Sequence, residues 1–117
     1  MACQWGMPGT PPPTEALAEL VSLLEEEETR ELVRLYLRDF PTTIEALANG
    51  PAKDHQRLAH SMKSSSQYMG ATDLAEIFKA LELRLSDPAE KVSPSDLEAI
   101  AAAFATIEGP LRSFAGG

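Results

Sequence analysis

The chain has 117 residues, of which 44% are hydrophobic, so it can form one ordinary domain but not a nucleotide-binding kinase domain beside another folded unit. Its formal net charge of −8 argues against nucleic acid as a partner, because a phosphate backbone would be repelled. The single Cys3 excludes an intrachain disulfide or a cysteine-based zinc site, and no apolar run approaches the roughly 20 residues that span a bilayer. We therefore expect a cytoplasmic monomer that binds no membrane.

Residues 1–13 are rich in glycine and proline and show no periodic pattern, so we expect a flexible arm before a domain that spans residues 14–117. Apolar residues at intervals of three and four predict a first helix from Thr14, its N-cap, to about Leu24. The run Glu25–Glu28 is expected to form a solvated turn and the acidic first turn of the next helix. Met1 and the terminal glycines favour a stand-alone protein.

A longer apolar stripe predicts a second helix over residues 29–49, kinked at Pro41 because proline removes one backbone donor. Asn49-Gly50-Pro51 should end this helix, and a third is predicted over residues 52–69, ended by Gly70. The residues of the second helix expected to face the core are Leu32, Val33, Tyr36, Leu37, Phe40, Ile44 and Leu47.

A fourth helix is predicted over residues 72–86, with Asp87-Pro88 as its stop. Ser93-Pro94-Ser95-Asp96 opens the last helix through a serine cap, a proline in the first position and an acid three residues after the cap. Gly109-Pro110 is expected to bend or end it, with Leu111 and Phe114 on a short continuation. The residues expected to face the core are Leu74, Ile77, Phe78, Leu81 and Leu85, then Leu97, Ile100, Ala101, Phe104 and Ile107.

No segment of useful length alternates between apolar and polar residues, so the sequence predicts no strands. The connections between the predicted helices are short, which favours antiparallel neighbours. The predicted fold is all-α, an antiparallel four-helix bundle with an additional short N-terminal helix.

The third helix carries the residues that point to a function. With a turn of about 100° per residue, Leu58, Met62 and Met69 fall on one line, which we expect to be buried. His60 lies two residues from both Leu58 and Met62 and therefore faces the opposite side. The polar residues that share this side are Gln56, Lys63, Ser64 and Gln67. The helix is thus expected to display the His60 imidazole to solvent beside a cation.

Spacing alone leaves several roles open for a helical histidine. Most such residues have no special role, and this is how we interpret His55, which leans toward the apolar side. No serine, cysteine or acid is placed to complete a nucleophile–base set, so hydrolysis is poorly supported. Because His55 and His60 lie on different faces, the sequence predicts no metal site.

A neutral imidazole can, however, attack phosphorus and form a phosphohistidine. Lys63, one turn from His60, would offset the new negative charge and, through like-charge repulsion, discourage protonation of the ring. Ser64 is short and would leave space for the active site of a partner to close over the imidazole.

Residues 60–71, His-Ser-Met-Lys-Ser-Ser-Ser-Gln-Tyr-Met-Gly-Ala, resemble the signature of the histidine phosphotransfer (HPt) domain family of two-component phosphorelays. Counted from the His, this pattern has a Lys three residues later, a small residue four residues later and Gly-Ala ten and eleven residues later. In this chain it is followed by Leu74 and by Ala80-Leu81-Glu82. Residues 31–41 are similar to the second helix of the family, so the resemblance covers roughly residues 14–114. Two positions depart from the pattern. Ser64 stands where the family often has Gly, and Tyr68 stands where many relatives have Asn.

The resemblance implies a phosphorelay intermediate, in which His60 accepts a phosphoryl group from a receiver-domain phospho-aspartate and passes it to another receiver. It assigns stabilisation of the phosphate to Lys63. The partners would be response-regulator receiver domains, a hybrid sensor histidine kinase, or both, and Mg²⁺ would belong to the receiver. The chain would then need no cofactor and would not be an enzyme by itself. The expected partner contacts are Gln56, Arg57, Ser64 and Gln67.

Two other interpretations stay open. A non-phosphorylated helical adaptor that binds receiver or kinase domains would use the same bundle, with His60 incidental. A small histidine- or metal-dependent phosphatase would turn over a phospho-substrate alone. The absence of a second acid or ligand near His60 on its helix argues against the phosphatase.

Overall fold

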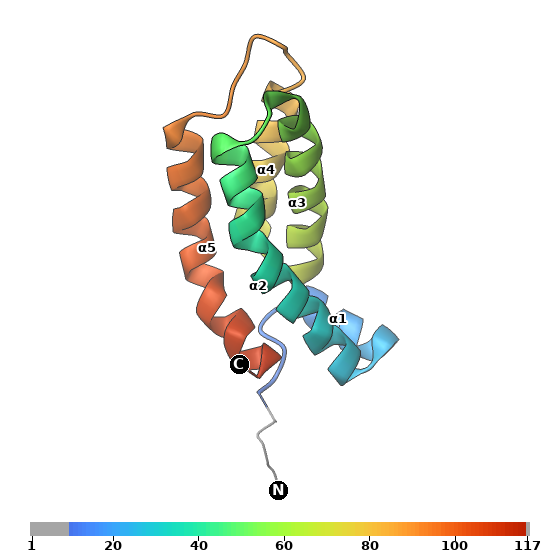
Figure 1. Cartoon of the computed structure of the whole chain (residues 1–117). Coiled ribbons are helices and arrows are strands. Elements are labelled where there is room, and N and C mark those ends of the chain that lie inside the picture. Colours follow the sequence, from blue (N-terminus) through green and yellow to red (C-terminus); the bar gives the residue numbers. More distant parts are fainter. Residues whose placement is uncertain (1–9, 117) are drawn as a thin grey trace, which may run out of the picture.

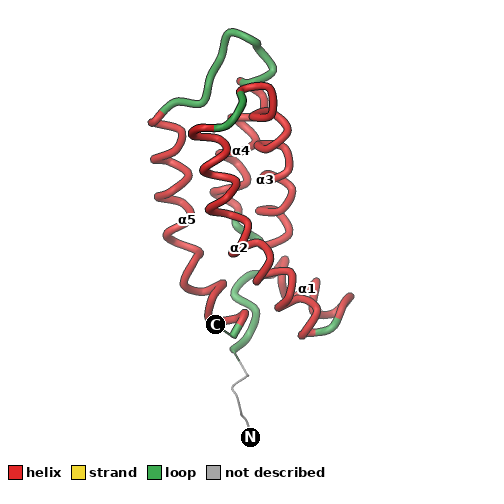
Figure 2. The backbone as a smooth tube through the Cα atoms, viewed as in Figure 1, coloured by secondary structure: helices red, strands yellow, loops and turns green. Residues whose placement is uncertain are grey.

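The computed structural model describes residues 10–116; residues 1–9 and 117, and with them most of the predicted arm, lie outside the described part. This part of the chain is all-helical, with no strand (Figure 2), which confirms the predicted fold class. The elements are α1 (Glu15–Leu24), α2 (Glu26–Asn49), the short 3-10 helix η1 (Ala52–Asp54), α3 (His55–Met69), α4 (Thr72–Arg84) and α5 (Pro94–Ala115).

Helices α2 to α5 form an antiparallel four-helix bundle (Figure 1). In this bundle α3 packs against α4, α2 contacts α3 and α5, and α4 contacts α5. The shorter α1 packs against α2 and α3 at the end of the bundle where α5 terminates. The α3–α4 pair has the most extensive contact, so these two helices together form one face of the molecule.

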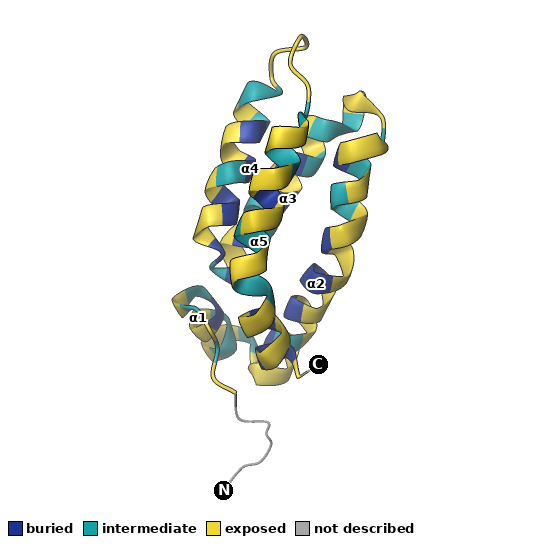
Figure 3. Cartoon of the chain, turned by 90° about the vertical axis from the view of Figure 1, so that its left-hand side faces the viewer, coloured by how far each residue is buried: buried dark blue, intermediate teal, exposed yellow. Residues whose placement is uncertain are grey.

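The buried residues, dark blue in Figure 3, lie on the parts of the helices that face the inside of the bundle. Phe78 of α4 is fully buried, and its ring meets that of Phe40 edge-on at 6.4 Å between centroids. Phe40 in turn stacks on Phe104 of α5 at 3.8 Å, so aromatic rings from three helices join in one core cluster.

Two predicted core positions were wrong, because Leu32 is 38% exposed and Ala101 is exposed. Leu58, which was expected to be buried, is half-buried and packs against the core. The same holds for Ile44, Ile77, Leu85, Leu97, Phe104 and Ile107. On α3 the two smallest buried residues, Ala59 and Ser66, are fully buried and complete the inner line with the predicted methionines. Small residues let neighbouring helices approach closely, and a pattern built on large apolar side chains does not register them.

The buried Ser66 hydroxyl has a partner in the core. It lies 2.8 Å from the hydroxyl of Tyr36 on α2, so both polar groups are hydrogen-bonded to each other. Burial raises the pKa of Tyr36, which therefore stays neutral at physiological pH. This pair links α2 to the inner side of α3, opposite the face that carries His60.

The turn between α3 and α4 is held by Thr14, the predicted N-cap of α1. Its hydroxyl accepts a hydrogen bond from the Leu17 amide at 3.2 Å and donates one to the Met69 carbonyl at 2.9 Å. Gly70 ends α3 with φ of 74°, and a Cβ atom there would collide with the Thr14 side chain. The sequence therefore needs glycine at this turn for two independent steric reasons.

Helix α5 does not end at Gly109-Pro110, which was one of the two alternatives predicted there, but continues to Ala115. Leu111 and Phe114 are fully buried, so their packing stabilises the extra turns. Pro110 has no backbone N–H, so the carbonyl one turn earlier in the helix lacks its usual hydrogen-bond donor. Because Pro110 is exposed, water can bind that carbonyl instead. Likewise α2 runs uninterrupted through the exposed Pro41.

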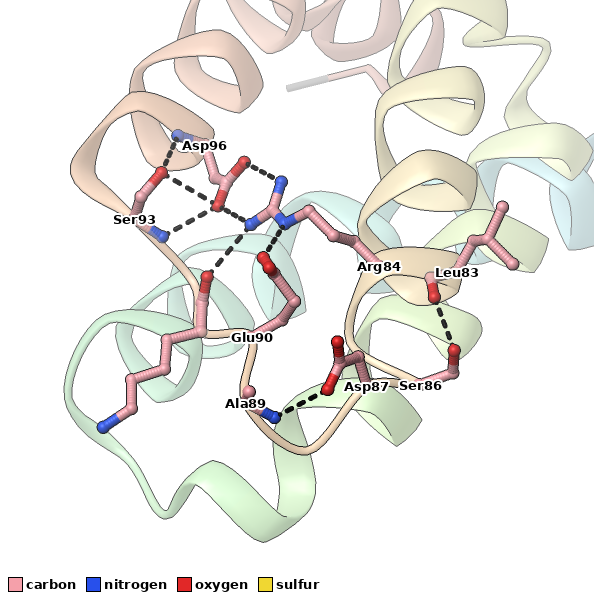
Figure 4. A network of polar contacts seen from close by, with 9 residues as sticks. Leu83, Arg84, Ser86, Asp87, Ala89, Glu90, Ser93 and Asp96 are labelled. Carbon is pink, nitrogen blue, oxygen red and sulfur yellow. Dashed lines mark hydrogen bonds and ion pairs between the residues drawn. The ribbon is translucent and has the colours of Figure 1, made fainter.

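The connection from α4 to α5 is closed by a polar network (Figure 4). Arg84 at the end of α4 makes two hydrogen bonds to the Asp96 carboxylate and a third to Glu90 at 2.9 Å. Asp96 also accepts from the Ser93 amide at 2.8 Å, while Ser93 caps the Asp96 amide, which confirms the predicted capping box. The N-terminus of α5 is thereby tied to the C-terminus of α4.

This network predicts a loss of stability in acid. The hydrogen bonds from Arg84 lower the pKa of Asp96 from 3.8 to about 2. The carboxylate therefore stabilises the fold above pH 4, and this contribution is lost as the pH falls from about 4 to about 2. We expect Asp96→Asn to cost of order 2 kcal/mol at pH 7. Urea unfolding should show the difference between the parent and the variant shrinking toward pH 2; a constant difference would contradict this.

Candidate functional site

The structure places His60 in the middle of α3 on the outer side of the α3–α4 face. Its side chain is 60% exposed, so the imidazole is open to a partner. The inner line of the helix, opposite His60, is buried at Met62 and Met69 as predicted.

A carboxylate from α4 binds both His60 and Lys63. Glu82 accepts a hydrogen bond from His60 Nδ1 through Oε2 at 2.7 Å, and its Oε1 lies 2.9 Å from Lys63 Nζ. Both Lys63 and Glu82 have side chains that are 23% exposed, so this contact is partly shielded from water. The three side chains form one connected group, which we call the His60 cluster.

Sequence reasoning did not assign a role to Glu82, although a signal for it exists. His60 lies eleven residues before Ala71, and Glu82 lies eleven residues after it. Because α3 and α4 are antiparallel and meet at a tight turn at Gly70-Ala71, residues equidistant from the turn lie side by side. An acid at this mirror position could therefore have been predicted to approach His60.

The charge state of Glu82 decides which ring nitrogen of His60 is available. The hydrogen bond from Lys63, followed by that from His60, lowers the pKa of Glu82, so its carboxylate is ionised at neutral pH and only accepts hydrogen bonds. The proton of the hydrogen bond must then belong to Nδ1 of His60. In a neutral ring this leaves the lone pair on Nε2, the nitrogen that Glu82 does not contact.

Lys63 binds the same carboxylate. Its ammonium is directed at Glu82, whose other oxygen binds His60. In a neutral ring, the tautomer set by Glu82 presents Nε2 to a partner. The effect of Lys63 on His60 that the sequence suggested stays a prediction.

The other predicted contact residues lie around His60 on the same side of α3. Gln56, Arg57 and Gln67 are exposed, and Ser64 is half-buried. Arg57 lies 3.5 Å from Asp54 of η1, and its side chain is 68% exposed, so it remains accessible to a larger partner. The structure thus gathers the predicted site residues on one surface.

His55 has a different environment. Its ring Nε2 lies 3.0 Å from the carbonyl of Ala46 and 3.1 Å from that of Gly50, so it donates to the C-terminal end of α2. The half-buried ring holds the connection between α2 and α3. This geometry agrees with the structural role that the sequence indicated.

The charge of α3 differs from that of the rest of the chain. The chain carries 18 acidic residues, yet α3 contains none, whereas α1, α2, α4 and α5 each contain at least two. Arg57 and Lys63 are the basic residues of α3, and Lys53 precedes it in η1. Helix α3 itself thus places no negative charge beside His60, and the acid of the His60 cluster comes from α4.

Two further observations concern metal ligands and membrane-spanning helices. Between residues 10 and 116, no three His, Cys, Asp or Glu side chains are grouped so that they could hold a metal ion. In the same range, no helix is both long and apolar enough to cross a membrane.

The family model of the Hpt domain matches residues 31–109, well over half of the chain. The chain belongs to the Hpt domain family. The matched range includes most of α2, all of α3 and α4, and most of α5, and with them all three residues of the His60 cluster. Comparison with curated proteins and with solved structures finds no match.

Membership of the Hpt family gives the chain a phosphotransfer role in two-component systems. Hpt domains are phosphocarriers rather than catalysts, and they work with receiver domains and histidine kinases. Helix α1 and the end of α5 lie outside the matched range of this Hpt domain.

Proposed function

We propose that this Hpt domain is a phosphorelay intermediate that accepts a phosphoryl group on Nε2 of His60 from a receiver phospho-aspartate and passes it to another receiver. The single observation that carries the proposal is the His60 cluster. There an exposed imidazole has Nδ1 bound to Glu82 at 2.7 Å and Nε2 free of that contact. The proposal includes a cytoplasmic, monomeric protein.

The transfer follows from this geometry. The Nε2 lone pair attacks the phosphorus, the bond from phosphorus to the aspartyl oxygen breaks, and the aspartate leaves as a carboxylate. The ring, now substituted at Nε2 and protonated at Nδ1, carries a positive charge, which the Glu82 carboxylate stabilises. The same charge makes the ring a good leaving group when a second aspartate attacks, so the reaction is reversible.

Lys63 and Glu82 support this step. Lys63 binds the same carboxylate as His60, and its ammonium would supply the positive charge that a phosphoryl group on the ring attracts. The hydrogen bond from Nδ1 to Glu82 orients the imidazole before a partner arrives. Because phosphoryl transfer depends mainly on positioning and electrostatics, this preorganisation is the contribution of the Hpt domain.

The charge pattern supports an acidic partner pocket. The acid-free α3 offers Arg57 and Lys63 around His60, and Gln56, Ser64 and Gln67 provide polar contacts without negative charge. A receiver would supply the phospho-aspartate, and the metal ion it needs would belong to the receiver. We propose these α3 residues as the partner-binding surface.

The test is to incubate the purified chain with phosphorylated receiver domains and identify the phosphorylated atom. We expect acid-labile, base-stable phosphate, and phosphorus NMR should assign it to Nε2 rather than Nδ1. Phosphate on Nδ1 would contradict the role given to Glu82. Absence of transfer from every receiver in a broad panel would contradict the relay itself.

Variants of the two partners of His60 should slow transfer without abolishing it. Lys63→Ala removes the cation, and Glu82→Gln keeps the size of the side chain but removes the charge that stabilises the phosphorylated ring. Interactions at such accessible sites are worth about 1 kcal/mol, so we expect a roughly fivefold slower transfer or a shorter phosphohistidine lifetime. Rapid-quench measurement of phosphate on His60 provides the rates.

Glu76→Gln serves as the matched control for Glu82→Gln. It makes the same substitution on the same helix at an exposed position outside the His60 cluster. This variant should transfer phosphate at the parent rate. If the Lys63 and Glu82 variants also matched the parent in transfer rate and phosphohistidine lifetime, neither residue would contribute to phosphotransfer.

A further inference from the structure

Helices α1 and α2 are joined by a single residue, Glu25, which has an unusual backbone conformation. Its φ is 103° and its ψ is 157°, a region that glycine occupies readily and that a Cβ atom disfavours. Among residues 10–116, every other residue with a positive φ is a glycine. The bend between α1 and α2 therefore concentrates backbone strain in one residue.

The local sequence does not require a bend at this position. Two leucines precede Glu25 and three glutamates follow it, and all of these residues favour a helix. Neither glycine nor proline occurs from Thr14 to Phe40, and the Glu25 side chain does not cap the start of α2. One local feature favours the break, because the acidic residues 26–28 interact well with the N-terminus of α2. Apart from this feature, the bend is held by the tertiary contacts of α1.

A small set of tertiary contacts holds α1 in the bent position. Leu17 is the one fully buried residue of α1, and Leu20 and Val21 are partly buried against the core. The Thr14 hydroxyl donates a hydrogen bond to the Met69 carbonyl at 2.9 Å. These contacts on one side and the strain at the bend on the other determine whether α1 stays docked.

The core of the four-helix bundle is independent of α1. Its aromatic cluster joins Phe40, Phe78 and Phe104 of α2, α4 and α5 and contains no residue of α1. If α1 swings away and Glu25 becomes helical, the N–H groups that begin α2, which lack acceptors within that helix, meet the carbonyls that end α1. The strain is then relieved, and residues 15–49 form one continuous helix.

We infer that Glu25 is a strained hinge that lets α1 leave the bundle as a unit and continue α2 as one straight helix. In the bent form, α1 lines a recess of about 440 Å³ together with Ser64 and Gln67 of α3. Release of α1 removes one wall of this recess. The hinge therefore controls how open the α3 surface is beside these proposed partner contacts, while the His60 cluster on α3 and α4 stays in place.

The first test measures the strain with two glycine variants. Glu25→Gly removes the Cβ atom at the strained position, and we expect the melting midpoint to rise by roughly 4 °C or more. Glu19→Gly makes the same substitution at an exposed position inside α1, where glycine is unfavourable, so the midpoint should fall. A midpoint for Glu25→Gly at or below that of the parent would overturn the inference, because position 25 would then hold no strain.

The second test measures the movement of α1. Spin labels are introduced at Ala18 and Thr42, two exposed positions on α1 and α2, in a Cys3→Ser background. In one straight helix these positions are 24 residues apart, about 36 Å along the axis. In the bent form they are closer, because α1 packs against α2 and α3 (Figure 1). Distance measurement by electron paramagnetic resonance separates the two forms.

We expect the parent to show mainly the shorter distance and Leu17→Ala, which removes the buried anchor of α1, to add a population at about 36 Å. Adding Glu25→Gly to Leu17→Ala should reduce this population, because glycine relieves the bend and weakens the straight helix. If Leu17→Ala shows only the shorter distance, or a broad distribution from an unfolded α1, the inference is wrong. If Leu17→Ala does not fold, Thr14→Val, which loses the hydrogen bond to Met69, takes its place with the same expected outcomes.

Discussion

The His60→Gln variant is expected to accept no phosphoryl group while it keeps the helical bundle. Glutamine has similar size and polarity, and His60 is 60% exposed, so the free energy of unfolding should change by no more than about 0.5 kcal/mol. The amide nitrogen of glutamine has no available lone pair and is a poor nucleophile. Transfer from a labelled phospho-receiver should fall to background, with an unchanged melting curve as evidence of folding.

The control for this variant is His55→Gln, the other histidine of the chain. Because His55 donates to two carbonyls at the end of α2, its replacement should cost about 1 kcal/mol of stability and leave phosphate uptake unchanged. Sequence analysis alone would predict no loss of stability here. Uptake of acid-labile phosphate by His60→Gln would disprove the assignment of the site. Receiver binding without any uptake, by the parent and both variants, would favour the adaptor.

The second large effect is expected for Phe78→Ala, in the core beneath the site. Phe78 is fully buried and contacts Phe40, so its truncation should cost about 3–5 kcal/mol through lost burial and the cavity that remains. A domain of this size is stable by only about 5–15 kcal/mol, so this is a large share of the total. Thermal unfolding followed by circular dichroism should show a midpoint lowered by roughly 10–30 °C.

Leu83→Ala is the matched control, since it truncates an apolar side chain on the same helix that is 75% exposed. We expect it to change the free energy of unfolding by less than about 0.5 kcal/mol. Well below its melting midpoint, Phe78→Ala should still accept phosphate, because Phe78 is buried in the core whereas the His60 imidazole is exposed on the outer side of α3. A melting midpoint for Phe78→Ala equal to that of Leu83→Ala would show that the core is not packed as described.

Several features of the site are local and were predictable from the sequence. The helical period of Met62 and Met69 determines which side of α3 is buried, and the two-residue offset of His60 places it on the other side. The ends of helices can also be predicted from single residues. Thr14 caps the start of α1, and Gly70 ends α3 in a left-handed backbone conformation. The neighbours of His60 within α3 are therefore known once the helix is known.

The sequence by itself determined the helices, the side of α3 that carries His60 and the resemblance to the Hpt family. Only the tertiary structure decided that the Glu82 carboxylate of α4 binds His60, and that Ser66 on the inner side of α3 is buried against Tyr36 of α2. Contacts within one helix follow from its period. Contacts between helices depend on their relative rotation and register, which arise from the packing of the whole core.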